Sequence, residues 1–477
     1  MRRFKTPNRG QLMLLPPNLN DWVPQNHSAR YVVDFVETLD LSKLYATYGE
    51  SGDGQPPYDP KMMLAILLYG NMRGISSSRK IECALFDDIG MRFITCGLAP
   101  DHDTIANFRK VHHAFLKDVF VACVRLALRG HIVALTHVAV DGTKVRANAS
   151  RNASRTESEL NKDIEFAKSY VGKYFDDLEK ADSAEDEEFG KGRNCYLLPA
   201  HLANAEARQS WIKAGLKELD EEDESQNNQD NDSDGKPKED SGKTTETKAP
   251  KSKLSRKLRK LNKAKSKLDE KEAKRKEEDP TGKRERDADR KRGKPFVPKI
   301  NITDPDSRTM LFPGGTFHEG FNGQIAVDNE AGIIVAADLT QDSNDVRQLA
   351  PMVQQIEENT GWLPDCASAD TGYFNVEHLE TPKLKSVDFY VAVRQRGKEK
   401  NLTSKSELMR EKLESDLGKA IYSQRKTIVE PVFGAIKHAR KFRQFLTRGF
   451  DMVRSEWYIC CIVHNLLKLQ KLGVTPV

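Results

Sequence analysis

IVALTHVAVDG, residues 132–142, is an apolar run rich in β-branched residues that ends in an aspartate and a glycine. A run of this length and composition predicts a buried strand, which we expect over Ile132–Val140 with Asp141 at its end. A second strand-like run, Cys366–Asp370, also ends in an aspartate and continues as Thr-Gly-Tyr. Asp-Gly and Asp-Thr-Gly are also ordinary turn signals, so each run alone is weak evidence of a site.

The order of the elements that follow predicts how the two aspartates meet. If residues 148–320 are an insertion, the order is that of a ribonuclease-H-like α/β domain, in which the first and fourth strands are neighbours. We therefore expect Asp141 and Asp370 to lie side by side. The elements, in chain order after the first strand, are a hairpin of strands at 321–328 and 333–338, a helix at 343–359, the strand ending at Asp370, a helix at 376–380, a strand at 389–393, and helices at 427–445 and 451–472.

A third acid, Glu430, is predicted near the start of the helix at 427–445. At about 100° per residue, one stripe of this helix carries an acid among three lysines. The acid could bind a metal ion while the lysines neutralise phosphates, although ordinary Glu–Lys pairs on a solvated surface give the same pattern. The stripe consists of Lys426, Glu430, Lys437 and Lys441.

Asp141, Asp370 and Glu430 together predict a site for divalent cations, because Mg²⁺ prefers carboxylate oxygens. Such a site suits two-metal phosphoryl transfer, in which one ion activates the nucleophile and the other stabilises the leaving oxygen. Asp338 ends a predicted strand and is the strongest rival to Asp370, but that strand should lie farther from the first. Other acids also compete, and they are Asp304, Asp306, Asp342 and Asp345.

The N-terminal part of the chain predicts an all-α domain over residues 1–130, followed by a catalytic domain over 131–477. Apolar residues recur with helical spacing through residues 28–135, and Asp101–Thr104 offers N-caps for one long helix that reaches Leu126. Short helices with tight turns fit a helix-turn-helix DNA-binding domain, and they fit a plain helical bundle equally well.

Charge is concentrated inside the predicted insertion. The chain has 477 residues and a formal charge of +5, yet residues 217–248 carry a net −7 and residues 249–294 a net +11. The rest is close to neutral, so nucleic-acid binding must depend on local basic faces. We predict that 217–294 is charged and partly disordered or helical. Leu254, Leu258, Leu261 and Leu268 follow heptad spacing, which fits a small coiled coil or a helix lying on DNA, but the high charge favours a solvated linker.

Cysteine usage and hydropathy indicate the compartment. Seven cysteines without a Cys-x-x-Cys pair argue against a zinc site and suit a reducing compartment. The N-terminus has no sustained apolar stretch, and the longest apolar run, Met62–Tyr69, is too short to span a bilayer. We expect a soluble, cytoplasmic protein with no membrane partner.

Motifs along most of the chain resemble those of the DDE transposases of bacterial insertion sequences, and are most similar to the IS-1182-like group. The third of the catalytic motifs is similar to the Tyr-Arg-Glu-Lys signature, here Tyr422, Arg425, Glu430 and Lys437. Arg425 is one position farther from the glutamate than in the usual signature and Lys426 is nearer, so either could contact phosphate. The other matching motifs are Tyr58–Pro60, Leu68–Gly70, Ser77–Lys80, Pro100–Arg109, Val140–Lys144, Ala147–Ser150 and Ala369–Tyr373.

This resemblance implies a ribonuclease-H-like catalytic domain that uses Mg²⁺ and tolerates Mn²⁺. It implies a homodimer acting on double-stranded DNA, with terminal inverted repeats and target DNA as substrates, in the bacterial cytoplasm and on the nucleoid. Asp141, Asp370 and Glu430 would be the catalytic metal ligands. The residues expected to contact DNA are Tyr422, Arg425, Lys426, Lys437 and Lys441.

The resulting hypothesis is a transposase that frees a 3′-OH by metal-dependent hydrolysis and joins it to target DNA by transesterification. A hydrolytic nuclease on the same fold, without strand transfer, would use the same residues. An inactive DNA-binding derivative is disfavoured because all three acids are present. An interaction protein organised by the charged segment at 251–276 is the alternative from another class.

Overall fold

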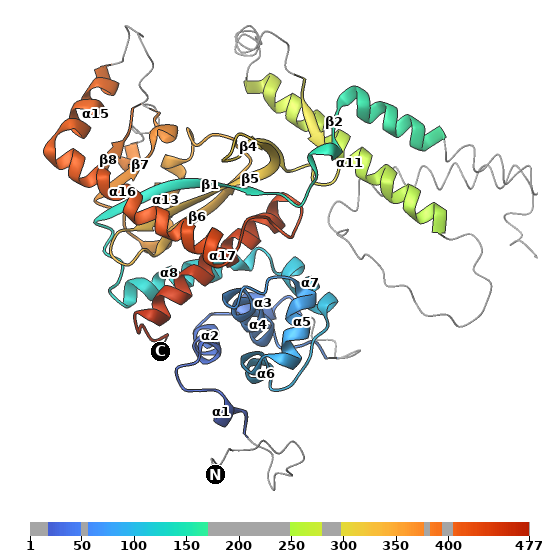
Figure 1. Cartoon of the computed structure of the whole chain (residues 1–477), viewed down its shortest axis with the longest axis horizontal. Coiled ribbons are helices and arrows are strands. Elements are labelled where there is room, and N and C mark those ends of the chain that lie inside the picture. Colours follow the sequence, from blue (N-terminus) through green and yellow to red (C-terminus); the bar gives the residue numbers. More distant parts are fainter. Residues whose placement is uncertain are drawn as a thin grey trace, which may run out of the picture. The chain divides into compact units, whose positions relative to one another are not determined.

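A computed structural model describes residues 18–48, 56–169, 249–278, 297–375, 382–393 and 404–476 (Figure 1). The chain divides into two compact units. Unit 1 comprises Met1–Arg151 and Asp306–Val477, and unit 2 comprises Asn152–Pro305. The helix predicted at 376–380 and most of the charged segment at 217–294 lie outside the described residues.

The N-terminal part of unit 1 is helical, as predicted. The prediction of one long helix from Asp101–Thr104 to Leu126 is wrong, however, because the helix stops at Val111 and a new one starts at Phe115. At the break, His113 Nδ1 lies 2.8 Å from the Lys110 carbonyl oxygen, which a continuing helix would use for its own backbone bond. The helices are α1 (Leu19–Trp22), α2 (Ser28–Glu37), α3 (Ser42–Tyr45), α4 (Pro60–Met72), α5 (Ser78–Asp87), α6 (Ile89–Thr95), α7 (His102–Val111) and α8 (Phe115–Arg129).

The centre of unit 1 is a six-stranded mixed sheet in the order β4-β5-β1-β7-β8, and β6 pairs with β5 along the same edge as β4. The predicted hairpin is confirmed as the antiparallel pair β5 and β6, and β1 lies parallel to β7. β1 and β7, the first and fourth strands of the predicted order, are therefore neighbours, as the ribonuclease-H-like order requires. The strands are β1 (His137–Arg146), β4 (Arg308–Leu311), β5 (Phe317–Asp328), β6 (Ile334–Thr340), β7 (Cys366–Ala369) and β8 (Asp388–Val391).

Strand β1 differs from its prediction at both ends. It begins at His137 instead of Ile132 and continues to Arg146, so Asp141 lies in the middle of the strand. The extension forms because β5 is long enough to pair with residues 142–146 as well as with 138–141. Asp141-Gly142 is therefore extended backbone and not the turn that its sequence suggested.

Helices on the sheet also begin elsewhere than predicted. Helix α13 begins at Leu349 and not at 343, and Val346 is exposed. Helix α16 packs on β1, β7 and β8 and begins at Asp416, so Glu430 lies near its end and not at its start. The elements are α13 (Leu349–Thr360), α15 (Ser404–Glu414), α16 (Asp416–Gly434), the π-helix η5 (Ala435–Ala439), α17 (Phe450–Lys471) and the short 3₁₀ turns η3 (Thr371–Tyr373) and η4 (Pro382–Leu384).

The C-terminal helix α17 contributes many buried side chains to the core of unit 1. It packs on β6 and on helices α4 and α8, and Trp457 is fully buried against Gly323 of β5, where an added Cβ would lie only 2.8 Å from the indole. No helix among the described residues is long and apolar enough to cross a membrane.

Unit 2 contains a packed helix within the charged segment for which a solvated linker was favoured. Helix α11 (Ala249–Glu278) buries Leu261, Ala264 and Leu268 together with Leu160 of the helix at 157–169. Ile300 of β3 (Lys299–Asn301) completes this cluster, and β3 pairs with β2 (Ser154–Thr156) after the 3₁₀ turn η1 (Arg151–Ala153). The favoured linker interpretation is therefore wrong for residues 258–277, where the heptad spacing reflects a packed face.

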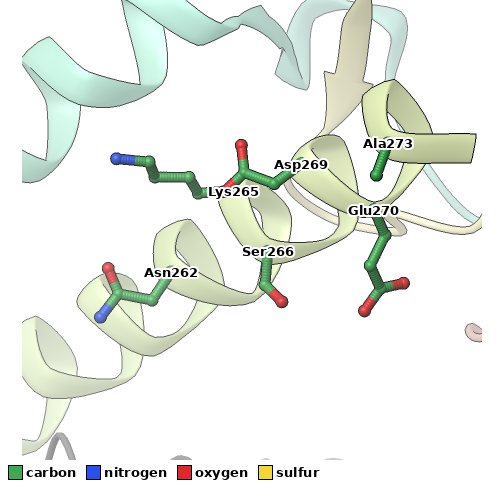
Figure 2. Close-up of a pocket in the computed structure, with 6 residues that line it drawn as sticks. All are labelled: Asn262, Lys265, Ser266, Asp269, Glu270 and Ala273. Carbon is green, nitrogen blue, oxygen red and sulfur yellow. The ribbon is translucent and has the colours of Figure 1, made fainter. Parts of the chain in front are cut away.

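A shallow hollow lies along α11 (Figure 2). All of its lining residues belong to one helix, and their charged groups are one lysine, Lys265, and two acids, Asp269 and Glu270. A depression made by one helix surface offers no converging polar groups, and we assign no ligand to it. It is lined by Asn262, Lys265, Ser266, Asp269, Glu270 and Ala273.

Substitution of Leu268 tests the packing of unit 2. Leu268→Ala removes a fully buried side chain and should cost about 2–5 kcal/mol of local stability. Hydrogen exchange of the amides in 157–169 and 258–277 should speed up accordingly, and Lys263→Ala at an exposed position of the same helix is the control. Unchanged protection in Leu268→Ala would contradict the packed helix pair.

Candidate active site

Two neighbouring parallel strands place Asp141 and Asp370 side by side. Val140 of β1 is in register with Ala369 of β7, and each aspartate is the next residue along the chain. Beyond this point η3 takes the chain away from β1, and the Asp370 carboxylate accepts a hydrogen bond of 2.8 Å from the Gly372 N–H. The site therefore lies where the two strands separate.

The environment of Asp141 disfavours its charged form. Burial raises the pKa of Asp141 from its ordinary 3.8 to about 6, the charges of Asp370 and Asp345 act in the same direction, and Arg425 and the Gly142 N–H oppose them. Arg425 Nη1 lies 3.3 Å from Asp141 Oδ2, and the side chain is only 11% exposed. Arg425 Nε is buried without a hydrogen-bond partner among the described residues.

This pKa shift predicts a pH-dependent stability in metal-free buffer. Because the folded pKa lies above the unfolded one, Asp141 destabilises the fold increasingly as pH rises from about 4 to 6. Asp141→Asn should raise the free energy of unfolding by about 2–3 kcal/mol at pH 7.5 and change it little below pH 4. Urea unfolding in EDTA across this range measures the difference, and an equal effect at both pH values would contradict the shift.

Asp345, considered above only as a competing acid, belongs to the same site. Its Oδ1 accepts hydrogen bonds of 2.7 Å from Asn322 Nδ2 and from Gln324 Nε2, and the Tyr373 hydroxyl donates to Gln324 Oε1. Asn322, Gln324 and Tyr373 are all at most 1% exposed.

Asn322, Gln324 and Tyr373 were not predicted from the sequence as site residues. The available signal was the polar pair Asn322 and Gln324, two residues apart in a strand whose neighbours are all buried.

Gly142 explains how Asp345 comes so close to β1. A Cβ on Gly142 would lie 2.5 Å from Gln324 Nε2, 2.7 Å from Asp345 Oδ1 and 3.0 Å from the Tyr373 hydroxyl. Any side chain at this position would push the polar groups away from the strand. The glycine after Asp141 therefore makes room for the acid from the loop between β6 and α13.

Glu430 is not gathered with the two aspartates. It is exposed on α16, and it makes no hydrogen bond or ion pair with the described residues. Within the described parts of the chain, no three His, Cys, Asp or Glu side chains are arranged to hold a metal ion. The structure thus brings together Asp141 and Asp370 of the predicted triad.

The predicted basic residues divide into two groups. Arg425 and Lys437 face the site: burial lowers the pKa of Lys437, whereas the charge of Asp141 raises it. Tyr422 lies beside Arg425, with the guanidinium carbon 5.9 Å from the ring centre. Lys426 and Lys441 are exposed, and Lys441 follows η5 with a left-handed backbone (φ 56°), so the predicted stripe does not continue to it.

The rival acids, apart from Asp345, have other roles. Asp338 on β6 forms a two-pronged ion pair with Arg454, at 2.6 and 3.0 Å, and β6 does not touch β1 in the sheet. Asp306 accepts a hydrogen bond from the first N–H of α17, and Asp342 accepts one from Gln348. Asp304 is buried and belongs to unit 2.

The donor set at this site suits a hard divalent cation. Asp141 and Asp370 offer adjacent carboxylates, which Mg²⁺ and Mn²⁺ prefer over nitrogen or sulfur ligands. The burial and mutual repulsion that raise the pKa of Asp141 would both be offset by a bound cation. The two aspartates therefore fit such an ion, with Arg425 the only cationic side chain in direct contact with Asp141 among the described residues.

Comparisons with known proteins match two parts of the chain. Residues 17–111 match the family described as "Transposase domain (DUF772)", and residues 297–466 match the family described as "Transposase DDE domain". The second match includes Asp370 and Glu430 but begins after Asp141. No curated protein and no solved structure matches the chain.

Proposed function

We propose, from the matches to two transposase domain families, that the chain cleaves the ends of an insertion sequence and joins them to target DNA. We propose further that it belongs to the IS-1182-like group, because of the motifs around Asp141, Asp370 and Glu430. The observation that carries the mechanism is the parallel pairing of β1 with β7, which sets Asp141 beside Asp370 where the strands separate.

Under this proposal, Asp141 and Asp370 would hold Mg²⁺, and Glu430 would join them when DNA is bound. The cation would supply a Lewis acid for the phosphodiester and would lower the pKa of the attacking water. Arg425 and Lys437 bring positive charge to the same place and bind phosphate oxygens of the DNA. The orientation of Arg425 towards Asp141 supports it over Lys426 as the phosphate contact nearest the acids.

DNA cleavage and DNA joining are tested separately. Full-length protein is incubated with Mg²⁺ and duplexes that contain the inverted repeats flanking its gene, and 3′-OH release is scored on denaturing gels. Pre-cleaved ends are then incubated with a plasmid target. Joined products support a transposase, cleavage without joining supports the hydrolytic nuclease, and binding without either supports the inactive derivative.

A homodimer on DNA is part of the same proposal, because two ends have to be brought together before joining. Light scattering of the protein with and without end duplex checks this. A complex of two protein chains and two duplexes is expected, and a complex of one chain with one duplex that nevertheless joins ends would rule it out.

Lys437 tests the assignment of the basic face. Lys437→Ala should weaken binding of the end duplex. The slope of log affinity against log salt concentration should fall by about one, the amount expected for one lost phosphate contact. Lys419→Ala, which changes an exposed lysine near the start of α16, is the matched control and should leave the slope unchanged. Equal slopes for both variants and the wild type would mean that Lys437 does not contact phosphate.

A further inference from the structure

Helix α11 carries its positive charge mainly in one part of its length. Residues 257–268 include six lysine and arginine residues and no acid, whereas residues 269–278 include four basic and five acidic residues. Ion pairing begins at the boundary of the two parts, where Lys267 Nζ lies 3.7 Å from a carboxylate oxygen of Glu270. The basic residues of the first part are Lys257, Arg259, Lys260, Lys263, Lys265 and Lys267.

The packing of α11 determines which of these residues face solvent. Its apolar side is buried against the helix at 157–169 and against β3. Lys257, Lys260 and Lys263 recur every three residues and are all exposed. Because α11 cannot turn them inward without exposing its apolar side, these three lysines form a fixed positive surface, which we call the lysine face.

The lysine face has no countercharge within the described residues. None of its three lysines forms an ion pair or a hydrogen bond there. Two acids of the neighbouring helix at 157–169 are engaged elsewhere, since Asp163 pairs with Arg155 at 3.2 Å and Glu159 accepts a hydrogen bond from the Thr156 N–H. Like charges three residues apart on a helix destabilise it, so an external anion would relieve the repulsion within the face.

Duplex DNA is the anion that fits the lysine face best. Residues 257–263 span about 9 Å at 1.5 Å per residue, and a duplex presents one phosphate charge per about 1.7 Å of its axis, so several phosphates lie within reach. Lysine binds phosphate as a point charge, and phosphate contacts carry no base sequence. A membrane surface fits less well, because a helix lying on lipid needs an exposed apolar side, and α11 buries its own.

We propose that the lysine face of α11 binds the phosphates of duplex DNA without regard to base sequence, which makes unit 2 a DNA-binding element in addition to the catalytic domain. This inference rests on the proposed function, which makes DNA the substrate. Helix α11 carries none of the residues proposed to cleave DNA, so the face adds affinity and takes no part in the chemistry.

The test measures binding of the full-length protein to two duplexes of equal length over a range of salt concentrations. One duplex contains an inverted repeat that flanks the gene, and the other has an unrelated sequence. The variant combines Lys257→Gln, Lys260→Gln and Lys263→Gln, which keep a similar helix propensity. The slope of log affinity against log salt concentration should fall by about two to three for both duplexes, because each lost phosphate contact contributes about 0.9. The ratio of the two affinities should stay the same.

A second triple variant removes the same charge from the same helix. Lys271→Gln, Lys274→Gln and Lys276→Gln lie where acids and bases are mixed, and together they should change the slope by less than about one. Replacement of the three face lysines by arginine keeps the charge and should keep the wild-type slope. Hydrogen exchange of residues 258–277 checks that α11 stays packed, and Lys260→Gln alone, with a fall of about one, decides the matter if the triple variant does not.

The binding data have four outcomes. A smaller slope on both duplexes in the glutamine variant of the lysine face alone supports the inference. A wild-type slope in that variant overturns it and assigns the face to an anion other than DNA. A change confined to the end duplex overturns binding without regard to sequence. Equal falls in the two glutamine variants reflect only the net charge of the protein and overturn the assignment to this face.

Cleavage assays separate this inference from the proposed function. The end duplex is incubated with Mg²⁺ at low salt, where binding by the wild type and by the lysine-face variant is saturated. A wild type that cleaves no ends, together with the expected fall in slope, overturns the proposed function and leaves DNA binding by α11 in place. Cleavage by both proteins, together with an unchanged slope, overturns the role of the lysine face alone.

Discussion

Asp370→Asn is expected to abolish cleavage of the end duplex while leaving binding of the same duplex largely intact. The substitution keeps the side-chain oxygen that accepts the Gly372 N–H, so the local turn is retained, and it removes one of two adjacent metal-binding charges. Loss of several kcal/mol of transition-state stabilisation corresponds to a fall in rate on the order of 10³-fold or more. Rates of 3′-OH release and end binding by gel shift, measured on the same preparation, check both parts.

Asp338→Asn is the matched control for this experiment. Asp338 belongs to a strand of the same sheet, but its carboxylate pairs with Arg454 and its strand is separated from β1 by β5. It should retain cleavage to within a few-fold once its stability has been checked. If Asp338→Asn lost cleavage and Asp370→Asn kept it, the catalytic pair would be wrongly assigned.

The sequence was sufficient to predict that Asp141 and Asp370 are neighbours. In this topology the order of the elements alone places the first and fourth strands side by side. In the structure these strands are β1 and β7, which pair in parallel with Val140 opposite Ala369. Strand limits were harder to predict, since residues 142–146 are extended only because β5 is long enough to pair with them.

The position of Asp345 could not be predicted in the same way. Its approach depends on the path of one loop and on the absence of a side chain at Gly142, and neither leaves a periodic pattern in the sequence. Asn322 and Gln324 did leave a signal, because polar residues at alternate positions of a buried strand need partners.

The position of Glu430 within α16 was missed for a different reason. The helix was predicted to begin at 427, but it begins at Asp416, where Ser415 accepts a hydrogen bond from the Gly418 N–H as its N-cap. Pro431 is tolerated inside the helix, and the backbone becomes a π-helix at Ala435–Ala439. π-Helical turns often occur at functional sites, and this one carries Lys437 towards Asp141.

Glu430→Gln is expected to separate catalysis from metal binding more sharply than any other substitution in this chain. Cleavage of the end duplex should fall on the order of 10³-fold, because the proposed reaction needs this carboxylate when DNA is in place. The affinity of the DNA-free protein for Mn²⁺ should change by less than about threefold, because Glu430 is exposed on α16 and is not grouped with the aspartates.

Both quantities are measured on the same Glu430→Gln protein, with Glu414→Gln at the exposed end of α15 as the control for the loss of one charge. Loss of Mn²⁺ binding in Glu430→Gln would show that the glutamate already belongs to the metal site without DNA. Full cleavage activity would instead remove Glu430 from the catalytic set. The expected combination, in which cleavage is lost and Mn²⁺ binding is retained, means that DNA binding brings α16 and the aspartates into their catalytic arrangement.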